Sequence, residues 1–193
     1  MIHAYIGNGK GKTTAAMGLA LRAAGADWHV AIVQFLKSGK SGETRLLADV
    51  PHVTLRSGKG TAKFTFAMDD EDRAHARAVH DANLSAALAE IDALLASRRA
   101  REAAGGAEGR GAEPPCANMM LVLDEALDAL AAGLLDEALA DRAVALSDEG
   151  VEVVFTGRAV VPAIEARADY ITRMECVRHP FGRGVRARIG VEL

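Results

Sequence analysis

Four short apolar runs of strand length stand out along the chain, separated by longer segments in which apolar residues recur at helical spacing. They are residues 2–6 (IHAYI), 29–35 (HVAIVQF), 119–123 (MMLVL) and 151–155 (VEVVF). Nearly continuous apolar runs of this length are typical of strands buried on both faces of a parallel sheet. Two weaker candidates are predicted to be a short third strand, 52–55, and the last core strand, 170–175.

Helices are predicted between these strands. The first carries apolar residues at helical spacing and stops at Gly25. Four others are predicted: a short one over 43–49, a long one from Asp69 or Asp70 to about Arg99, one that ends near Leu146, and a short one over 161–167. Segment 100–117, rich in Gly, Ala and Glu, is predicted to be a disordered insertion without chemistry. The alternation predicts one α/β domain spanning 1–193, with right-handed crossovers and a mostly parallel sheet.

A glycine-rich turn joins the first strand to the first helix. It reads GNGKGKTT, comprising Gly7, Asn8, Gly9, Lys10, Gly11, Lys12, Thr13 and Thr14. Backbone N–H groups of such a turn and the helix N-terminus can point at phosphate oxygens, Lys12 can reach a phosphate, and Thr13 can ligate Mg²⁺. The loop departs from the common pattern, which would place its first glycine at position 6, where this chain has Ile6. The alternative is a glycine-rich turn without a ligand.

A carboxylate pair, Asp124 and Glu125, directly follows the third apolar run. At the carboxyl end of a strand, beside a phosphate loop, such a pair would hold Mg²⁺ or a water molecule. The same string, LDEAL, recurs at 135–139, where Asp136 and Glu137 resemble an ordinary helix start. Only the first copy follows a strand, so only the first is predicted to be functional.

Three further polar segments follow predicted strands. The loop 36–43 carries Lys37, Lys40 and Glu43, and is either a ligand-binding loop or a solvated one. Segment 56–66 carries Phe64 and Phe66, which either face a flat apolar ligand or anchor the loop to the core. Arg158, just after the strand 151–155, could pair with phosphate or lie in a subunit contact.

Composition limits the classes of function. A net charge of -3 gives no basic signature of nucleic-acid binding, and no apolar run approaches the length of a membrane span. The residues at the start resemble no targeting peptide, so we expect a cytoplasmic protein. Cys116 and Cys176 form no CxxC motif, and the scattered histidines predict no transition-metal site.

In combination, these motifs resemble the P-loop type ATP:corrinoid (cob(I)alamin) adenosyltransferases over nearly the whole chain. The resemblance rests on GNGKGKTT, VQFLK (33–37), GETRLL (42–47), FTF (64–66), LVLDE (121–125), FTGR (155–158) and RHPF with GVRARIGVE near the end. It implies a RecA-like fold with helices on both faces of the sheet, a homodimer, and a flavoprotein as reductant. The implied reaction transfers the 5′-deoxyadenosyl group of ATP to a Co(I) corrinoid and releases triphosphate.

The resemblance also implies roles for single residues. Residues 8–14 would hold the leaving triphosphate, with Lys12 and a Mg²⁺ on Thr13 stabilising its charge. Arg22 matches an arginine near the nucleotide, Glu125 beside Asp124 would complete the Mg²⁺ environment, and Phe64 and Phe66 would pack by the corrin ring.

Departures from the family pattern fall mainly on the presumed corrinoid side. Phe66 stands where Trp is frequent, Leu127 and Asp128 follow the carboxylate pair, and HPFGRG replaces HPFDAG near the end. Two other functions therefore stay open at this point: a P-loop ATPase or kinase, and a divergent protein that binds ATP or a corrinoid as a carrier.

Overall fold

In the part of the chain that the structure describes, six parallel strands form one sheet in the order β3-β2-β4-β5-β1-β6. They are β1 (Ile2–Ile6), β2 (His29–Gln34), β3 (Val53–Ser57), β4 (Met119–Asp124), β5 (Glu152–Thr156) and β6 (Tyr170–Arg173). The computed structural model describes residues 1–37, 42–58, 60–61, 63–105 and 117–191. The predicted α/β, RecA-like fold with a parallel sheet is confirmed.

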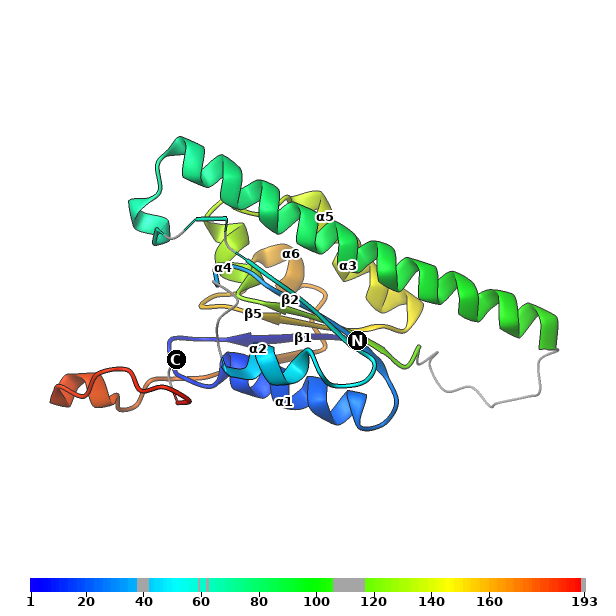
Figure 1. Ribbon diagram of the computed structural model, residues 1–193, viewed down its shortest axis with the longest axis horizontal. Helices are drawn as coiled ribbons and strands as arrows, with labels where there is room; N and C mark the ends of the chain where they lie inside the picture. The colour runs from blue at the N-terminus through cyan, green and yellow to red at the C-terminus, as the bar shows by residue number, and fades with distance from the viewer. Residues whose placement is uncertain (38–41, 59, 62, 106–116, 192–193) are drawn as a thin grey trace.

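Helices cover both faces of the sheet (Figure 1). The helices α1 (Lys12–Ala24) and α2 (Gly42–Leu47) lie on one face, and α3 (Asp70–Gly105), α4 (Ala126–Ala131), α5 (Glu137–Ala145) and α6 (Pro162–Glu165) on the other. Each face has its own apolar cluster, because successive residues of a strand point to opposite sides. The central strand β4 is buried at all of its positions, which explains its continuous apolar sequence.

Strand order decides which segments meet at the carboxyl edge of the sheet. Strand β5 lies between β1 and β4, so the turn after β1 and the carboxylates after β4 are two strand spacings apart, about 10 Å. The turn after β1, the loop after β3 and the start of α3 lie at the same end of the sheet in Figure 1. Segments distant in sequence are therefore brought to one edge.

Helix α3 extends further than its apolar pattern predicts. It ends at Gly105 rather than near Arg99, so the first residues of the predicted insertion, 100–105, are helical. Ala, Arg and Glu are strong helix formers, and Arg98 pairs with Glu102 one turn later at 2.7 Å. The rest of that prediction, residues 106–116 with Cys116, lies outside the described residues, whereas Ala117 beyond it is buried.

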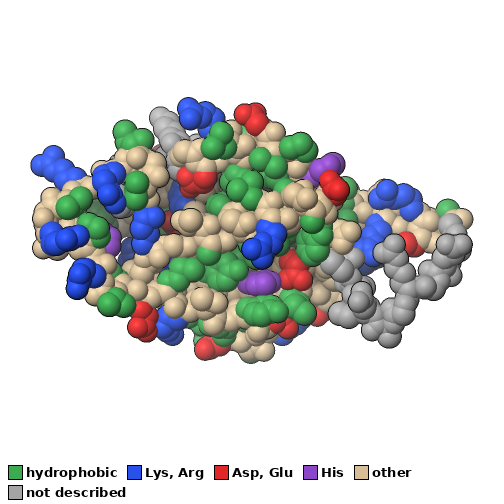
Figure 2. All heavy atoms as spheres, turned by 90° about the horizontal axis from the view of Figure 1, so that it is seen from below, with side chains coloured by type: hydrophobic (Ala, Val, Ile, Leu, Met, Phe, Trp, Pro, Cys, Tyr) green, Lys and Arg blue, Asp and Glu red, His purple; other side chains and the backbone are tan. Residues whose placement is uncertain are grey.

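The prediction of a last core strand is wrong in one respect. Strand β6 lies at the sheet edge and every one of its residues is exposed, because within the described chain it pairs only with β1. Beyond residues 174–176, the chain that follows β6 extends away from the sheet (Figure 1). Seen from below, Lys and Arg side chains gather at the end of the molecule where this segment lies (Figure 2). Among the helices described, none combines the length and apolar character needed to cross a membrane.

Candidate active site

The glycine-rich turn is hydrogen-bonded to two other segments of the chain. The N–H of Gly7 donates to the carbonyl of Arg158 at 3.0 Å, and the N–H of Gly9 donates to the carbonyl of Met174 at 2.8 Å. The side-chain oxygen of Asn8 accepts from the N–H of Cys176 at 3.0 Å. The turn is therefore fixed by the residues that follow β5 and β6.

Two glycines of the turn are required by this close packing. A Cβ on Gly7 would lie 2.2 Å from the carbonyl oxygen of Met174, and one on Gly9 would lie 2.8 Å from the backbone of Glu175. Gly7 also has a φ of +111°, which side-chain-bearing residues rarely adopt. Close approach of the segment 174–176 thus explains glycine at both positions.

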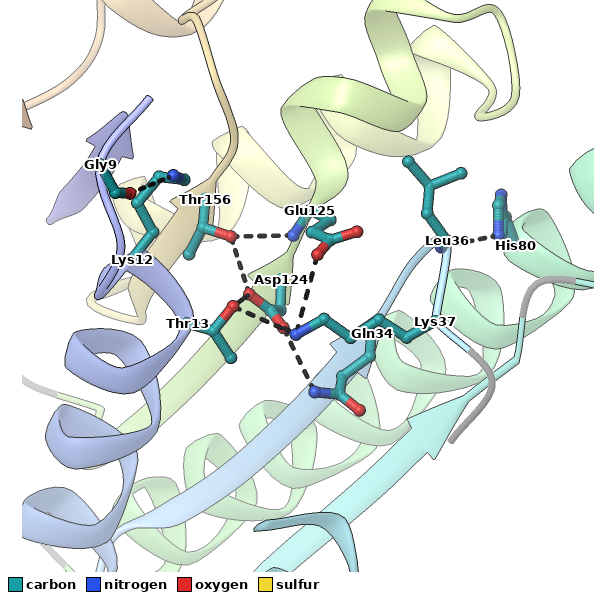
Figure 3. Close-up of polar contacts among 10 residues, drawn as sticks. All are labelled: Gly9, Lys12, Thr13, Gln34, Leu36, Lys37, His80, Asp124, Glu125 and Thr156. Carbon is teal, nitrogen blue, oxygen red and sulfur yellow. Dashed lines mark hydrogen bonds and ion pairs between the residues drawn. The ribbon is translucent and has the colours of Figure 1, made fainter. Parts of the chain in front are cut away.

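Lys12 lies at the first position of α1, where helix N–H groups lack intrahelical partners. Its Nζ donates to the carbonyl oxygen of Gly9 at 2.8 Å, so the side chain folds back over the turn (Figure 3). No residue of the first turn of α1 is acidic, so α1 itself supplies no negative charge to the positive end of its dipole. The arrangement suits an anion.

A buried carboxylate, Asp124 at the end of β4, is the centre of the polar contacts (Figure 3). Its Oδ1 accepts from the hydroxyls of Thr13 and Thr156, both at 2.8 Å. Its Oδ2 accepts from the Lys37 ammonium at 2.6 Å and from the Gln34 amide at 3.2 Å. Side chains from α1, β5 and the carboxyl end of β2 therefore converge on one carboxylate.

Glu125 follows in a left-handed backbone conformation, with φ +63°, which is uncommon for a residue with a side chain. Its N–H donates to the Thr156 hydroxyl at 2.8 Å, and its carboxylate lies 3.9 Å from the Lys37 ammonium. Burial raises the pKa of the Glu125 carboxyl, and the positive charge of Lys37 opposes that rise. The strained backbone aims this carboxylate toward the same space as Thr13 and Asp124.

The donor set fits Mg²⁺. It consists of a hydroxyl and two carboxylates, the hard oxygen ligands that Mg²⁺ prefers when phosphate oxygens and water complete its shell. In addition, Oε1 of the buried Gln34 has no hydrogen-bond partner among the described residues, so it can accept from a metal-bound water. Within the same residues, no group of three or more His, Cys, Asp and Glu side chains is placed to hold a metal.

An open pocket of about 420 Å³ adjoins the turn. Its lining consists of Gly7, Asn8, Arg158, Arg173, Glu175 and Cys176. The guanidinium groups of Arg158 and Arg173 outnumber the carboxylate of Glu175 in this lining and give it a net positive charge, which suits a polyphosphate. The sequence pointed to Arg158, but Arg173 was missed; its place at the end of a strand parallel to β1 was the available signal.

Phe64 and Phe66 form a parallel aromatic pair at the short 3₁₀ turn Thr65–Ala67, of which Phe64 is the N-cap residue. Their ring centroids are 5.7 Å apart with an interplanar angle of 4°, and the side chains are 69% and 89% exposed. The alternative of core anchoring is wrong for this pair, because its rings lie on the surface. Lys63 pairs with Asp69 at 2.8 Å, and Asp69 accepts from the N–H of Asp72 at the start of α3.

The remaining predicted residues are placed as follows. Lys10 and Thr14 are exposed on the turn and the first turn of α1, and Gly11 has φ +117° at the helix start. Arg22 lies in the last turn of α1, about 15 Å along the helix from Lys12, so the chain does not bring it to the turn. Lys40 lies outside the described residues. Gln34 and Thr156, which contact Asp124, were not predicted.

The second LDEAL copy has the structural role that its context predicted. Asp136 is the N-cap of α5, and its carboxylate accepts from the N–H of Ala138 at 2.8 Å. That hydrogen bond, with a further one from Arg77, lowers the pKa of the Asp136 carboxyl. The two identical strings therefore differ in structure: the first places Asp124 and Glu125 among the polar contacts at the carboxyl edge of the sheet, and the second caps a helix.

Comparison with known proteins agrees with this geometry. The family model of ATP:corrinoid adenosyltransferase BtuR/CobO/CobP matches residues 1–193. A corrinoid adenosyltransferase of Pseudomonas aeruginosa is 32% identical over 191 residues, covering 97% of this chain and 81% of the relative. Relatives from Escherichia coli K12 and Salmonella typhimurium, the latter described as corrinoid adenosyltransferase CobA, are each 31% identical, covering 100% of this chain and 85% of theirs. The chain therefore belongs to the ATP:corrinoid adenosyltransferase family.

Proposed function

We propose that the carboxyl edge of the sheet carries out the family's reaction: transfer of the 5′-deoxyadenosyl group of ATP to the Co(I) of a corrinoid. The cobalt supplies both electrons of the new Co–C bond, the C5′–O bond of ATP breaks, and triphosphate leaves with that bond's electrons. The observation that carries the proposal is the joint presence, at one edge, of the Thr13–Asp124–Glu125 oxygens and an exposed aromatic pair. The activity belongs to adenosylcobalamin biosynthesis or salvage.

The chain's contribution on the ATP side is to hold the leaving group. The first-turn N–H groups of α1 and the Lys12 ammonium lie where they can bind the triphosphate, and Arg158 and Arg173 flank it. Among the described residues, Lys12 has a single hydrogen bond, to the carbonyl oxygen of Gly9, to release when phosphate binds. Mg²⁺, when bound by Thr13, Glu125 and Asp124, would offset the negative charge that builds up on triphosphate.

On the corrinoid side, Phe64 and Phe66 supply a flat apolar surface. Two parallel rings exposed to 69% and 89% suit packing against a macrocycle that is itself flat. By resemblance, this packing displaces the lower axial ligand and makes the reduction to Co(I) feasible. Because cobalt is the nucleophile, the chain needs no nucleophilic side chain.

Other parts of the proposal rest on the resemblance. They are a homodimer, a flavoprotein that delivers the electron, a cytoplasmic location and a role for Arg22 near the nucleotide. The distance of Arg22 from the turn, about 15 Å along α1, means that a contact with the same chain's ATP has no support in this geometry. Equilibrium sedimentation tests the homodimer directly.

The test is an anaerobic assay with chemically reduced Co(I) corrinoid and MgATP. We expect loss of the Co(I) absorbance together with one equivalent of triphosphate. Formation of ADP and phosphate would instead support a P-loop ATPase, and binding of ATP without alkylation would support a carrier.

Substitution of both aromatics tests the corrinoid face. Phe64→Ala with Phe66→Ala is expected to raise the corrinoid KM and lower the rate at least tenfold, with ATP affinity unchanged. Leu21→Ala removes a half-exposed apolar side chain from α1, away from this edge, and serves as the control. Equal activity of the double variant and the control would contradict the assignment of the pair.

A further inference from the structure

Lys37 follows β2 by three residues and directs its ammonium group into the oxygen cluster described above (Figure 3). Its Nζ lies 2.6 Å from Oδ2 of Asp124, 3.1 Å from the Thr13 hydroxyl and 3.9 Å from Oε1 of Glu125. These are the oxygens assigned above to Mg²⁺. A side-chain cation therefore lies where the metal's ligands converge.

The charge of Asp124 explains why a cation is held there. The carboxylate is completely buried, and an isolated buried charge is strongly unfavourable unless it is paired. Its other partners, Thr13, Thr156 and Gln34, are neutral. Lys37 is the one cationic partner of Asp124 among the described residues, and it is itself only 21% exposed.

Lys37 and Mg²⁺ cannot contact these oxygens at the same time. Mg²⁺ binds oxygen at about 2.0–2.1 Å, which would place the metal and the ammonium close enough for strong repulsion. The Thr13 hydroxyl accepts from Lys37 while it donates to Asp124, so a metal would have to replace Lys37 at that oxygen.

The backbone of the two residues before Lys37 is held by hydrogen bonds, so the side chain of Lys37 is the part that we expect to change place. The N–H of Phe35 donates to the carbonyl of Asp124 at 2.9 Å, and the N–H of Leu36, with φ +55°, donates to Nε2 of His80 at 3.3 Å. Oε1 of Gln34, which has no hydrogen-bond partner among the described residues, lies in the same cluster and can accept from the Lys37 ammonium when it changes place.

We infer that Lys37 is a tethered counter-ion of Asp124 that Mg²⁺ displaces, which makes binding of the metal depend on the nucleotide. The inference rests on the Mg²⁺ site of the proposed function. Metal alone competes with a tethered cation for Asp124 and binds poorly. Metal that arrives with ATP brings phosphate oxygens, which give the released ammonium a new partner. Lys37 thereby prevents the metal from occupying the site without its substrate.

The experiment measures Mg²⁺ binding without nucleotide, by calorimetric titration with MgCl₂ and by the effect of MgCl₂ on the thermal unfolding midpoint. Lys37→Met is expected to bind Mg²⁺ at least tenfold more tightly than the unaltered protein, and its midpoint, lowered in EDTA, is expected to recover with MgCl₂. Lys37→Arg keeps the charge and should remain insensitive. Arg101→Met removes one positive charge from the exposed end of α3 and controls for net charge.

Equal Mg²⁺ affinity in the unaltered protein, Lys37→Met and Arg101→Met would overturn the inference. If Lys37→Met does not fold, Lys37→Gln retains a hydrogen bond to Asp124 without the charge and is expected to show the same gain in Mg²⁺ affinity. The adenosyl-transfer assay on the unaltered protein separates the two proposals. Transfer with equal metal affinities refutes only the counter-ion, whereas a metal difference without transfer refutes only the transferase function.

Discussion

A methyl group on Gly7 tests whether the phosphate loop is shaped by the segment that follows β6. In Gly7→Ala the new Cβ would lie 2.2 Å from the carbonyl oxygen of Met174, where real Cβ contacts stay above 3.0 Å. The two segments would have to separate by roughly 0.8 Å to relieve this contact. The backbone φ of +111° would remain unfavourable for alanine even then.

The expected loss follows from the contacts that would be disturbed. A residue held in a sparsely populated backbone region costs about 1–3 kcal/mol. Separation would also weaken two hydrogen bonds of Met174, to the N–H of Gly9 at 2.8 Å and to the carbonyl of Ile6 at 2.7 Å, each worth about 1 kcal/mol. Gly7→Ala is therefore expected to lose about 3–5 kcal/mol of the free energy of unfolding, a large part of the total for a domain.

Urea unfolding followed by circular dichroism measures this loss, with Gly18→Ala as the matched control. Gly18 lies within α1, and a Cβ there would meet nothing within 4 Å. That substitution should stabilise the protein by up to about 1 kcal/mol, because alanine favours helix more than glycine. A loss below about 0.5 kcal/mol in Gly7→Ala would refute the reasoning, since effects of that size are common at unconstrained surface positions.

Two further predictions concern charge. Burial lowers the pKa of His80 below its usual 6.5, so His80 binds a proton less readily in the folded protein than in the unfolded chain. The contribution of His80 to the free energy of unfolding should therefore be fully present above pH 6.5 and fall as the pH drops below that value. Urea unfolding between pH 7.5 and 5 should show this fall in the free energy of unfolding for His75→Gln, a control at an exposed histidine. The fall should be smaller for His80→Gln, and the same dependence on pH in both variants would contradict the prediction. Asp124→Asn should weaken MgATP binding, measured by calorimetry, at least tenfold. Asp136→Asn keeps a good N-cap residue and should leave that affinity unchanged. Equal affinities of the two variants for MgATP would show that Asp124 is not part of the site.

The elements that could be predicted are those whose signal is local. Continuous apolar runs predicted β1, β2, β4 and β5, because a strand buried on both faces needs apolar residues at successive positions. The two LDEAL copies could be told apart because only one follows such a run. The glycine-rich turn was identified for the same reason, from the strand before it and the helix after it.

What could not be predicted depends on strand order. Gln34, Lys37 and Thr156 meet Asp124 because β2 and β5 are the neighbours of β4, and periodicity carries no information about which strands are neighbours. The exposure of β6 was missed for the same reason, since an edge strand with apolar residues has the same local pattern as a buried one. The left-handed backbone of Glu125 could not be predicted either, because glycine is the residue that usually indicates this conformation in a sequence.

The edge position of β6 has a consequence for the site. The phosphate loop receives hydrogen bonds and close contacts from residues 174–176, which directly follow β6, and within the described chain β6 is held to the sheet by β1 alone. Strands of this kind belong to the parts of a protein that open with the least free energy. The shape of the loop therefore depends on a weakly held strand, and whatever binds the exposed side of β6, with Tyr170 and Ile171 half exposed there, also stabilises the loop. Affinity for ATP is thus expected to be coupled, through residues 174–176, to the stability of β6 at this edge.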